Sequence, residues 1–179
     1  MKLNTRDTCM IALFVAIIAI CAQIAIPLPG GVPFTLQTWA ILLAGLLLGS
    51  KKGAIATIAY LLLGAVGVPV FANFSSGFFR LIGPTGGFLL SFPIMAYISG
   101  LGAIKNKTAF TIGSLLLGVI INFICGMLIF MLVVNTSINV AFSATVLPFI
   151  PSSAFQIVMV MVVGSLIKNA LKKSGIVLH

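Results

Sequence analysis

Long apolar segments run along almost the whole of this chain, and only short stretches rich in Gly, Pro or Lys separate them. A helix needs roughly 20 apolar residues to cross a bilayer, and a shorter one is accommodated by tilt or by burial against its neighbours. The segments predict six membrane-spanning helices, at about residues 8–26, 36–49, 53–66, 84–104, 108–134 and 147–171. We expect Pro93 to kink the fourth of them.

The scarcity of charge supports the same fold class. Charged residues make up 6% of the 179 residues, whereas a soluble domain carries about 25% because its surface faces water. Six spans leave no room for a separate soluble domain, so we expect residues 1–179 to form one all-α integral membrane domain. The first apolar stretch is longer than the core of a typical signal peptide and is interpreted as a retained first helix.

The basic residues predict how the chain lies in the membrane. All of the ten except Arg80 stand in short clusters at the termini or between apolar segments. Such clusters are typical of the cytoplasmic side, so we expect both termini in the cytoplasm. No basic stripe is interleaved with aromatic residues, which argues against a nucleic-acid partner. The nine clustered residues are Lys2, Arg6, Lys51, Lys52, Lys105, Lys107, Lys168, Lys172 and Lys173.

Residues for acid–base or metal chemistry are almost missing. Asp7 is the single acidic residue, and the single His is the last residue of the sequence. Proton relays and most acid–base or metal-assisted catalysis need such groups inside the fold, and no phosphate-binding GxxxxGK[ST] motif occurs. We therefore expect no catalytic residue, no metal site and no cofactor, so the protein is not predicted to be an enzyme. If it drives uptake, the energy must come from a partner.

The expected external loops carry the unusual sequence, and Arg80 lies in the second of them. That loop reads GVPVFANFSSGFFRLIGPTGG and combines aromatic, Gly and uncharged polar residues. A guanidinium offers a planar fork of donors that matches a carboxylate, and a glycine-rich helix start also favours an anion. With no protein carboxylate nearby, a small anionic ligand is the natural counter-ion. The alternatives are an arginine that snorkels at the surface and a GPTGG that is only a tight turn.

Several of these segments are similar to one family. VPFTLQT with AILLAGLLLG (residues 32–49), GVPVFANFSSGFFRLIGPTGGF (67–88) and PFIP (148–151) resemble the biotin-transporter S components called BioY, over nearly the whole chain. Those are substrate-binding subunits of energy-coupling-factor (ECF) transporters in the plasma membrane of prokaryotes. The resemblance implies capture of a vitamin-like acid outside the cell. It also implies a transmembrane coupling protein and two cytoplasmic ATPase subunits as partners, with Ala12 and Ala16 on the docking helix.

The sequence departs from the family pattern at the start of the last helix. The family reads PFIPGDxxK there, whereas this chain reads PFIPSSAFQ, and Phe88 replaces a frequent Tyr. Ser153 and Gln156 thus stand where Asp and Lys would bind a polar ring such as the ureido group of biotin. A more apolar site admits lipoate as a rival, with its dithiolane ring against Phe74, Trp39 or Phe155. On this basis we expect lipoate to bind at least as well as biotin.

The expected binding site combines the loop residues with the start of the last helix. Arg80 would hold the ligand carboxylate, helped by Asn73 and Gln37. Other function classes stay open from the residues alone: a small channel or exporter subunit not coupled to ATPases, or a membrane enzyme. The predicted substrate-binding residues are Gln37, Trp39, Asn73, Phe74, Arg80, Thr85, Gly86, Phe88, Ser153 and Gln156.

Overall fold

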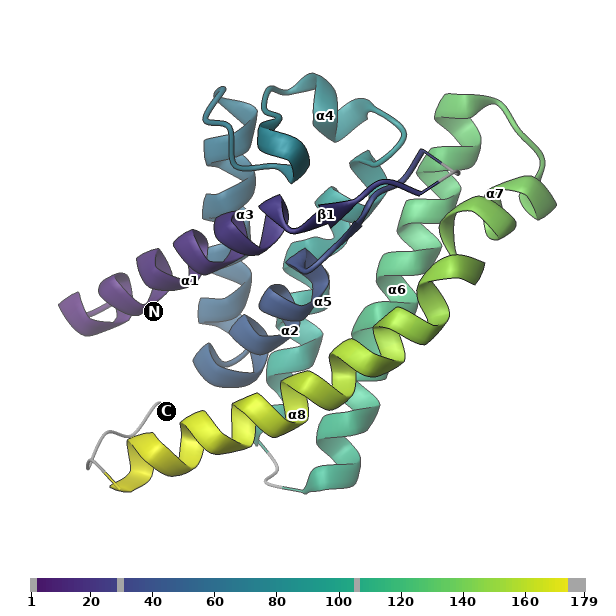
Figure 1. Ribbon diagram of the computed structural model, residues 1–179. Helices are drawn as coiled ribbons and strands as arrows, with labels where there is room; N and C mark the ends of the chain where they lie inside the picture. The colour runs from purple at the N-terminus through teal and green to yellow at the C-terminus, as the bar shows by residue number, and fades with distance from the viewer. Residues whose placement is uncertain (1–2, 29–30, 105–106, 174–179) are drawn as a thin grey trace.

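The computed structural model describes residues 3–28, 31–104 and 107–173, and these are dominated by long helices (Figure 1). Each predicted segment contains one helix. Four stretches of the described chain are long and apolar enough to cross a membrane: α1, α5, α6 and the segment Ile138–Lys173, which contains α8. The six long helices are α1 (Thr5–Gln23), α2 (Gln37–Leu48), α3 (Ser50–Ala65), α5 (Gly86–Ile104), α6 (Thr108–Val134) and α8 (Ile150–Lys173).

Short elements that the sequence did not predict join these helices. They gather toward one end of the molecule, away from the α2–α3 turn and the end of α8 (Figure 1). The first helix stops at Gln23, earlier than expected, because the next residues pair in a hairpin, with Ala25 opposite Thr35. The short elements are β1 (Ala25–Ile26), β2 (Phe34–Thr35), the 3₁₀ turn η1 (Ala72–Phe74), α4 (Phe79–Ile82), α7 (Ile138–Thr145) and the 3₁₀ turn η2 (Leu147–Phe149).

Helix α5 is the centre of the packing and contacts α2, α3 and α6. Helix α2 is too short to cross a bilayer unaided, and almost all of its side chains are buried. Pro93 lies inside α5, which continues through it to Ile104. Gly45 brings α2 against the backbone of α5, since a Cβ at this position would overlap the Ala96 carbonyl oxygen. Close approach through small residues is the usual way in which helices associate in lipid.

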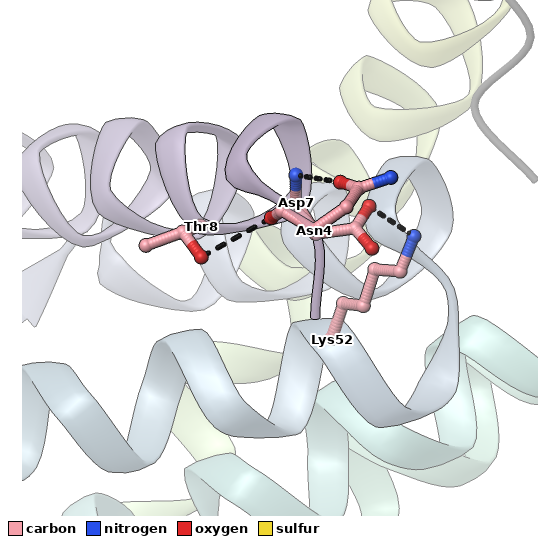
Figure 2. Close-up of polar contacts among 4 residues, drawn as sticks. All are labelled: Asn4, Asp7, Thr8 and Lys52. Atoms are coloured by element: carbon pink, nitrogen blue, oxygen red, sulfur yellow. Dashed lines mark hydrogen bonds and ion pairs between the residues drawn. The ribbon is translucent and has the colours of Figure 1, made fainter. Parts of the chain in front are cut away.

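The one acidic residue joins the starts of α1 and α3 (Figure 2). The Asp7 carboxylate lies 2.5 Å from Lys52 Nζ, and both side chains are partly shielded from solvent. The Asn4 side chain caps α1 by accepting a hydrogen bond of 2.7 Å from the Asp7 backbone N–H. Asp7 is thus paired with Lys52, at the end of the molecule where most of the described basic residues lie.

Two glycines provide a matched test of the α2–α5 contact. We expect Gly45→Ala to lower the free energy of unfolding by about 1–3 kcal/mol, because the new methyl group overlaps the α5 backbone. Gly113→Ala on α6 is the control: its Cβ would meet open space, and alanine favours the helix by up to ~1 kcal/mol. Thermal unfolding of both variants in the same detergent measures the difference. Equal melting temperatures would contradict the close contact.

Candidate ligand-binding site

A cavity of about 250 Å³ opens among the short elements at one end of the helices. Small-molecule sites usually occupy roughly 300–1,000 Å³, so this one suits a compact ligand. Its wall combines aromatic rings, among them Phe88, Phe92 and Phe123, with amide and hydroxyl side chains. The β1–β2 hairpin, the start of α2, residues 71–75, α4, α5, α6 and the start of α8 all contribute.

The structure brings most of the predicted residues to this cavity, but not all of them. Phe74 is 71% exposed and Phe155 is 63% exposed, and neither lines the cavity. Trp39 packs against the apolar core, and its Nε1 has no hydrogen-bond partner in the described chain. Gly86 is the first residue of α5 and does not line the cavity, and a Cβ at this position would overlap the Leu81 carbonyl. The predicted residues that do line it are Gln37, Asn73, Arg80, Thr85, Phe88, Ser153 and Gln156.

Gln37 belongs to a buried chain of hydrogen bonds that holds the cavity wall. Thr35 Oγ1 donates to Gln37 Oε1 at 3.0 Å, and Gln37 Nε2 donates to the Tyr60 hydroxyl at 2.5 Å. The Tyr60 hydroxyl in turn donates to the Val70 carbonyl at 2.9 Å. The chain connects the hairpin, α2, α3 and the segment before η1. Both polar atoms of the Gln37 amide therefore have a partner within the protein, and the side chain also lines the cavity.

Gln156 has one amide atom occupied and one free. Its Nε2 donates to the Thr35 carbonyl at 3.1 Å, whereas its Oε1 is buried without a partner among the described residues. The Thr35 carbonyl fixes this orientation, since turning the amide would bring two acceptor oxygens together. Ser153 lies one helical turn earlier on the same wall and is also buried. A buried acceptor without a donor is costly, so Gln156 Oε1 is suited to an N–H group of a ligand.

Arg80 is a cation at the cavity without an acidic partner in the described part of the chain. It lies on the short helix α4, is exposed, and contributes to the cavity wall. The single carboxylate side chain belongs to Asp7, which is bound to Lys52. Asn73 lies on the same wall, in the left-handed backbone conformation with a φ of 56°. The two side chains provide donors for an anionic group near the solvent.

Asn122 on α6 is a cavity residue that the sequence reasoning missed. It is 2% exposed, and its Nδ2 donates to the Phe88 carbonyl at 2.9 Å and to Ser91 Oγ at 2.7 Å. An asparagine in the middle of a long apolar helix is expensive in lipid and marks a functional or packing site. That signal was present in the sequence and could have identified it.

Ala12 and Ala16 lie on the exposed face of α1, away from the cavity. Both are small residues one turn apart, and the neighbouring Leu13 and Ile20 are also exposed. Within the described chain, the side chains on this face of α1 are therefore largely uncovered.

Comparison with known proteins identifies the family. The family model described as "BioY family" matches residues 1–173. This chain belongs to the BioY family. A relative from Thermotoga maritima, named "Biotin transporter BioY", is 40% identical over 169 residues, which cover 94% of this chain and 96% of the relative. A relative from Pyrococcus horikoshii, named "Probable biotin transporter BioY", is 40% identical over 148 residues, covering 83% and 87%.

A solved structure agrees with the fold. It is described as "the S-component for biotin from an ECF-type ABC transporter" and superposes with a TM-score of 0.83 at 25% identity. The match covers 94% of this chain and 95% of that one. With its long apolar helices, this BioY-family chain is a multi-pass membrane protein.

Proposed function

We propose that this chain is the S component of an ECF-type importer and captures biotin. The observation that carries the proposal is that one cavity is lined both by a buried acceptor without a partner, Gln156 Oε1, and by a cation without an acidic partner in the described chain, Arg80. Biotin supplies the missing partner for each, because it has ureido N–H donors at one end and a carboxylate at the other. The names of the relatives and of the solved neighbour agree with this ligand.

The carboxylate of biotin binds Arg80 in this proposal. The guanidinium forms charge-assisted, two-point hydrogen bonds with a carboxylate, which are stronger than bonds between neutral groups. Asn73 lines the same cavity and would add a donor. The rest of the lining is mostly aromatic and aliphatic and suits the hydrocarbon tail of the ligand.

The ureido ring binds near Gln156 and Ser153. Gln156 Oε1 accepts a ring N–H, which removes the cost of a buried acceptor without a donor. A dithiolane ring has no N–H to offer and would leave this oxygen unpaired. The free acceptor therefore supports biotin ahead of lipoate, which reverses the preference that we expected from the sequence.

The proposed membrane arrangement has six spans and cytoplasmic termini. Arg6, Lys51, Lys107 and the lysines of the last turns of α8 stand at helix ends away from the cavity, whereas Arg80 stands beside it. The positive-inside rule then puts the cavity on the external side. Biotin would enter from outside and leave to the cytoplasm only when partner subunits act.

The proposed partners are a transmembrane coupling protein and two cytoplasmic ATPases. The exposed face of α1 around Ala12 and Ala16 is the proposed docking surface for the coupling protein. Small side chains one turn apart allow another helix to come close and to slide. The chain itself has no phosphate-binding motif with which to hydrolyse ATP.

The first prediction concerns Arg80. Arg80→Ala should weaken biotin binding by about tenfold to a hundredfold, because a charge-assisted hydrogen bond contributes about 1.5–3 kcal/mol. Arg80→Lys should recover only part of this, since the planar fork is lost. Arg6→Ala, which changes the chain's other arginine at the far end, is the matched control. Titration of biotin and of its carboxamide into the purified proteins provides the test. Equal binding of acid and amide to the wild type would refute the assignment of Arg80.

The second prediction concerns Gln156. Gln156→Met keeps the size of the side chain but removes the free acceptor, so biotin should bind about tenfold more weakly. Lipoate should lose much less, because its ring makes no hydrogen bond with this atom. Calorimetric titration of both acids into both proteins separates the loss of the hydrogen bond to the ureido ring from a general weakening of ligand binding. If both acids lose the same factor, or if the wild type prefers lipoate, Gln156 does not bind a ureido ring.

The third prediction addresses the membrane arrangement in cells. A cysteine introduced at Ser76 should react with an impermeant thiol reagent from outside, and one at Lys51 should not. Biotin uptake should stop when the ATPase subunits are deleted, while binding to the isolated chain persists. Labelling at Lys51 from outside would reverse the orientation. Undiminished uptake without the ATPases would indicate an uncoupled channel instead.

A further inference from the structure

A tight loop, residues 71–75, forms one wall of the cavity. Two of its residues have an unusual backbone conformation. Asn73 and Phe74 both have positive φ values, of 56° and 54°. Phe71 and Ser75 pair across the loop, and the Phe71 N–H donates to the Ser75 carbonyl at 3.0 Å. Four residues of this loop line the cavity, namely Phe71, Ala72, Asn73 and Ser75.

The left-handed conformation is costly at Phe74. A residue with a Cβ pays roughly 1–2 kcal/mol there, and only Gly and, to a lesser degree, Asn adopt it readily. The Phe74 ring is 71% exposed, so burial of the side chain does not offset this cost. The backbone of Phe74 must therefore be held by contacts from elsewhere in the structure.

Gln23, the last residue of α1, makes those contacts. Its Oε1 accepts a hydrogen bond of 2.8 Å from the Phe74 backbone N–H. Its Nε2 lies 3.4 Å from the Val70 carbonyl oxygen and 3.3 Å from that of Phe71, and donates to Ala19 of its own helix at 3.0 Å. One amide thus holds both sides of the loop while anchored to α1.

The loop has a second anchor, on α3. The Phe71 ring fits against Gly64, where any Cβ would collide with it, and meets the Tyr60 ring edge-on with centroids 5.6 Å apart. The Val70 carbonyl accepts from Tyr60 as well as from Gln23. Phe71 and Tyr60 fix where the loop begins. They do not reach Phe74, whose N–H is held by Gln23.

We propose that Gln23 is a positioning residue for ligand binding: it holds the 71–75 loop in the shape that presents Asn73 to the cavity. Gln23 does not itself line the cavity, so it acts through the loop. This inference rests on the proposed function only in naming biotin as the ligand. Removing the Gln23 amide frees Phe74 to leave the left-handed conformation, and the loop then closes less tightly over the ligand.

The test compares Gln23→Met with Thr111→Val. Gln23→Met keeps the bulk of the side chain and removes all of its hydrogen bonds to the loop. Thr111→Val is the matched control, because it also removes a side-chain bond to a backbone carbonyl, from Thr111 to Gly102 at 2.9 Å, in a contact between α5 and α6 that does not line the cavity. The two readouts are hydrogen exchange at the Phe74 amide without ligand and the dissociation rate of biotin.

In Gln23→Met, exchange at the Phe74 amide should accelerate about tenfold or more, and biotin should dissociate about threefold to tenfold faster. In Thr111→Val, neither quantity should change, even where the melting temperature falls. Should Gln23→Met not fold, Gln23→Ala gives the same readouts, because its side chain also has no oxygen to accept from the Phe74 N–H and no donor for the Val70 and Phe71 carbonyls. It should likewise speed biotin dissociation.

An unchanged biotin dissociation rate in a folded Gln23 variant would overturn the inference. If the wild type bound no biotin, the proposed ligand would be wrong, and the exchange rates alone would decide whether Gln23 holds the loop.

Discussion

The hydrogen-bond chain from Thr35 through Gln37 and Tyr60 to Val70 is the interaction on which the binding end of this protein depends. Inside a membrane protein no water is at hand to replace a lost partner, so each buried polar group must be satisfied by the chain or by a ligand. The chain of bonds joins the hairpin and the start of α2 to α3 and to the segment before η1. It holds the hairpin and the segment before the 71–75 loop against α2 and α3.

The long helices could be predicted from sequence because length and apolar character alone determine them. Each predicted segment contains one, within a few residues at the ends. The short elements could not be predicted in this way. Strands of two residues, as in Ala25–Ile26, and the single turn of η1 leave no periodic pattern, and they form because long-range partners such as Gln23 and Gln156 hold them.

The difference between local sequence patterns and long-range contacts also explains which side chains of the candidate site could be placed from the sequence. Ser153 and Gln156 stand three residues apart on α8 and so share a face, whereas Phe155 falls on the opposite side, where it is exposed. Helical spacing could have shown this in advance. For Phe74, the direction depends on a positive φ that no sequence pattern indicates in a phenylalanine. Motifs therefore identified several polar residues of the cavity but not Asn122, and the aromatic residues were assigned less well because many apolar residues are interchangeable in lipid.

The candidate binding site and the proposed docking face meet in one helix. Helix α1 presents Ala12 and Ala16 on its exposed side, and its last residue, Gln23, holds the loop that lines the cavity. A partner that tilts or shifts α1 would therefore pull on Phe74 and, through it, on Asn73. Because the left-handed conformation at Phe74 is costly without its hydrogen bond, even a small displacement of Gln23 favours release of the loop. If α1 is the docking helix, as we propose, the Gln23 amide would connect the docking surface to the loop that lines the cavity.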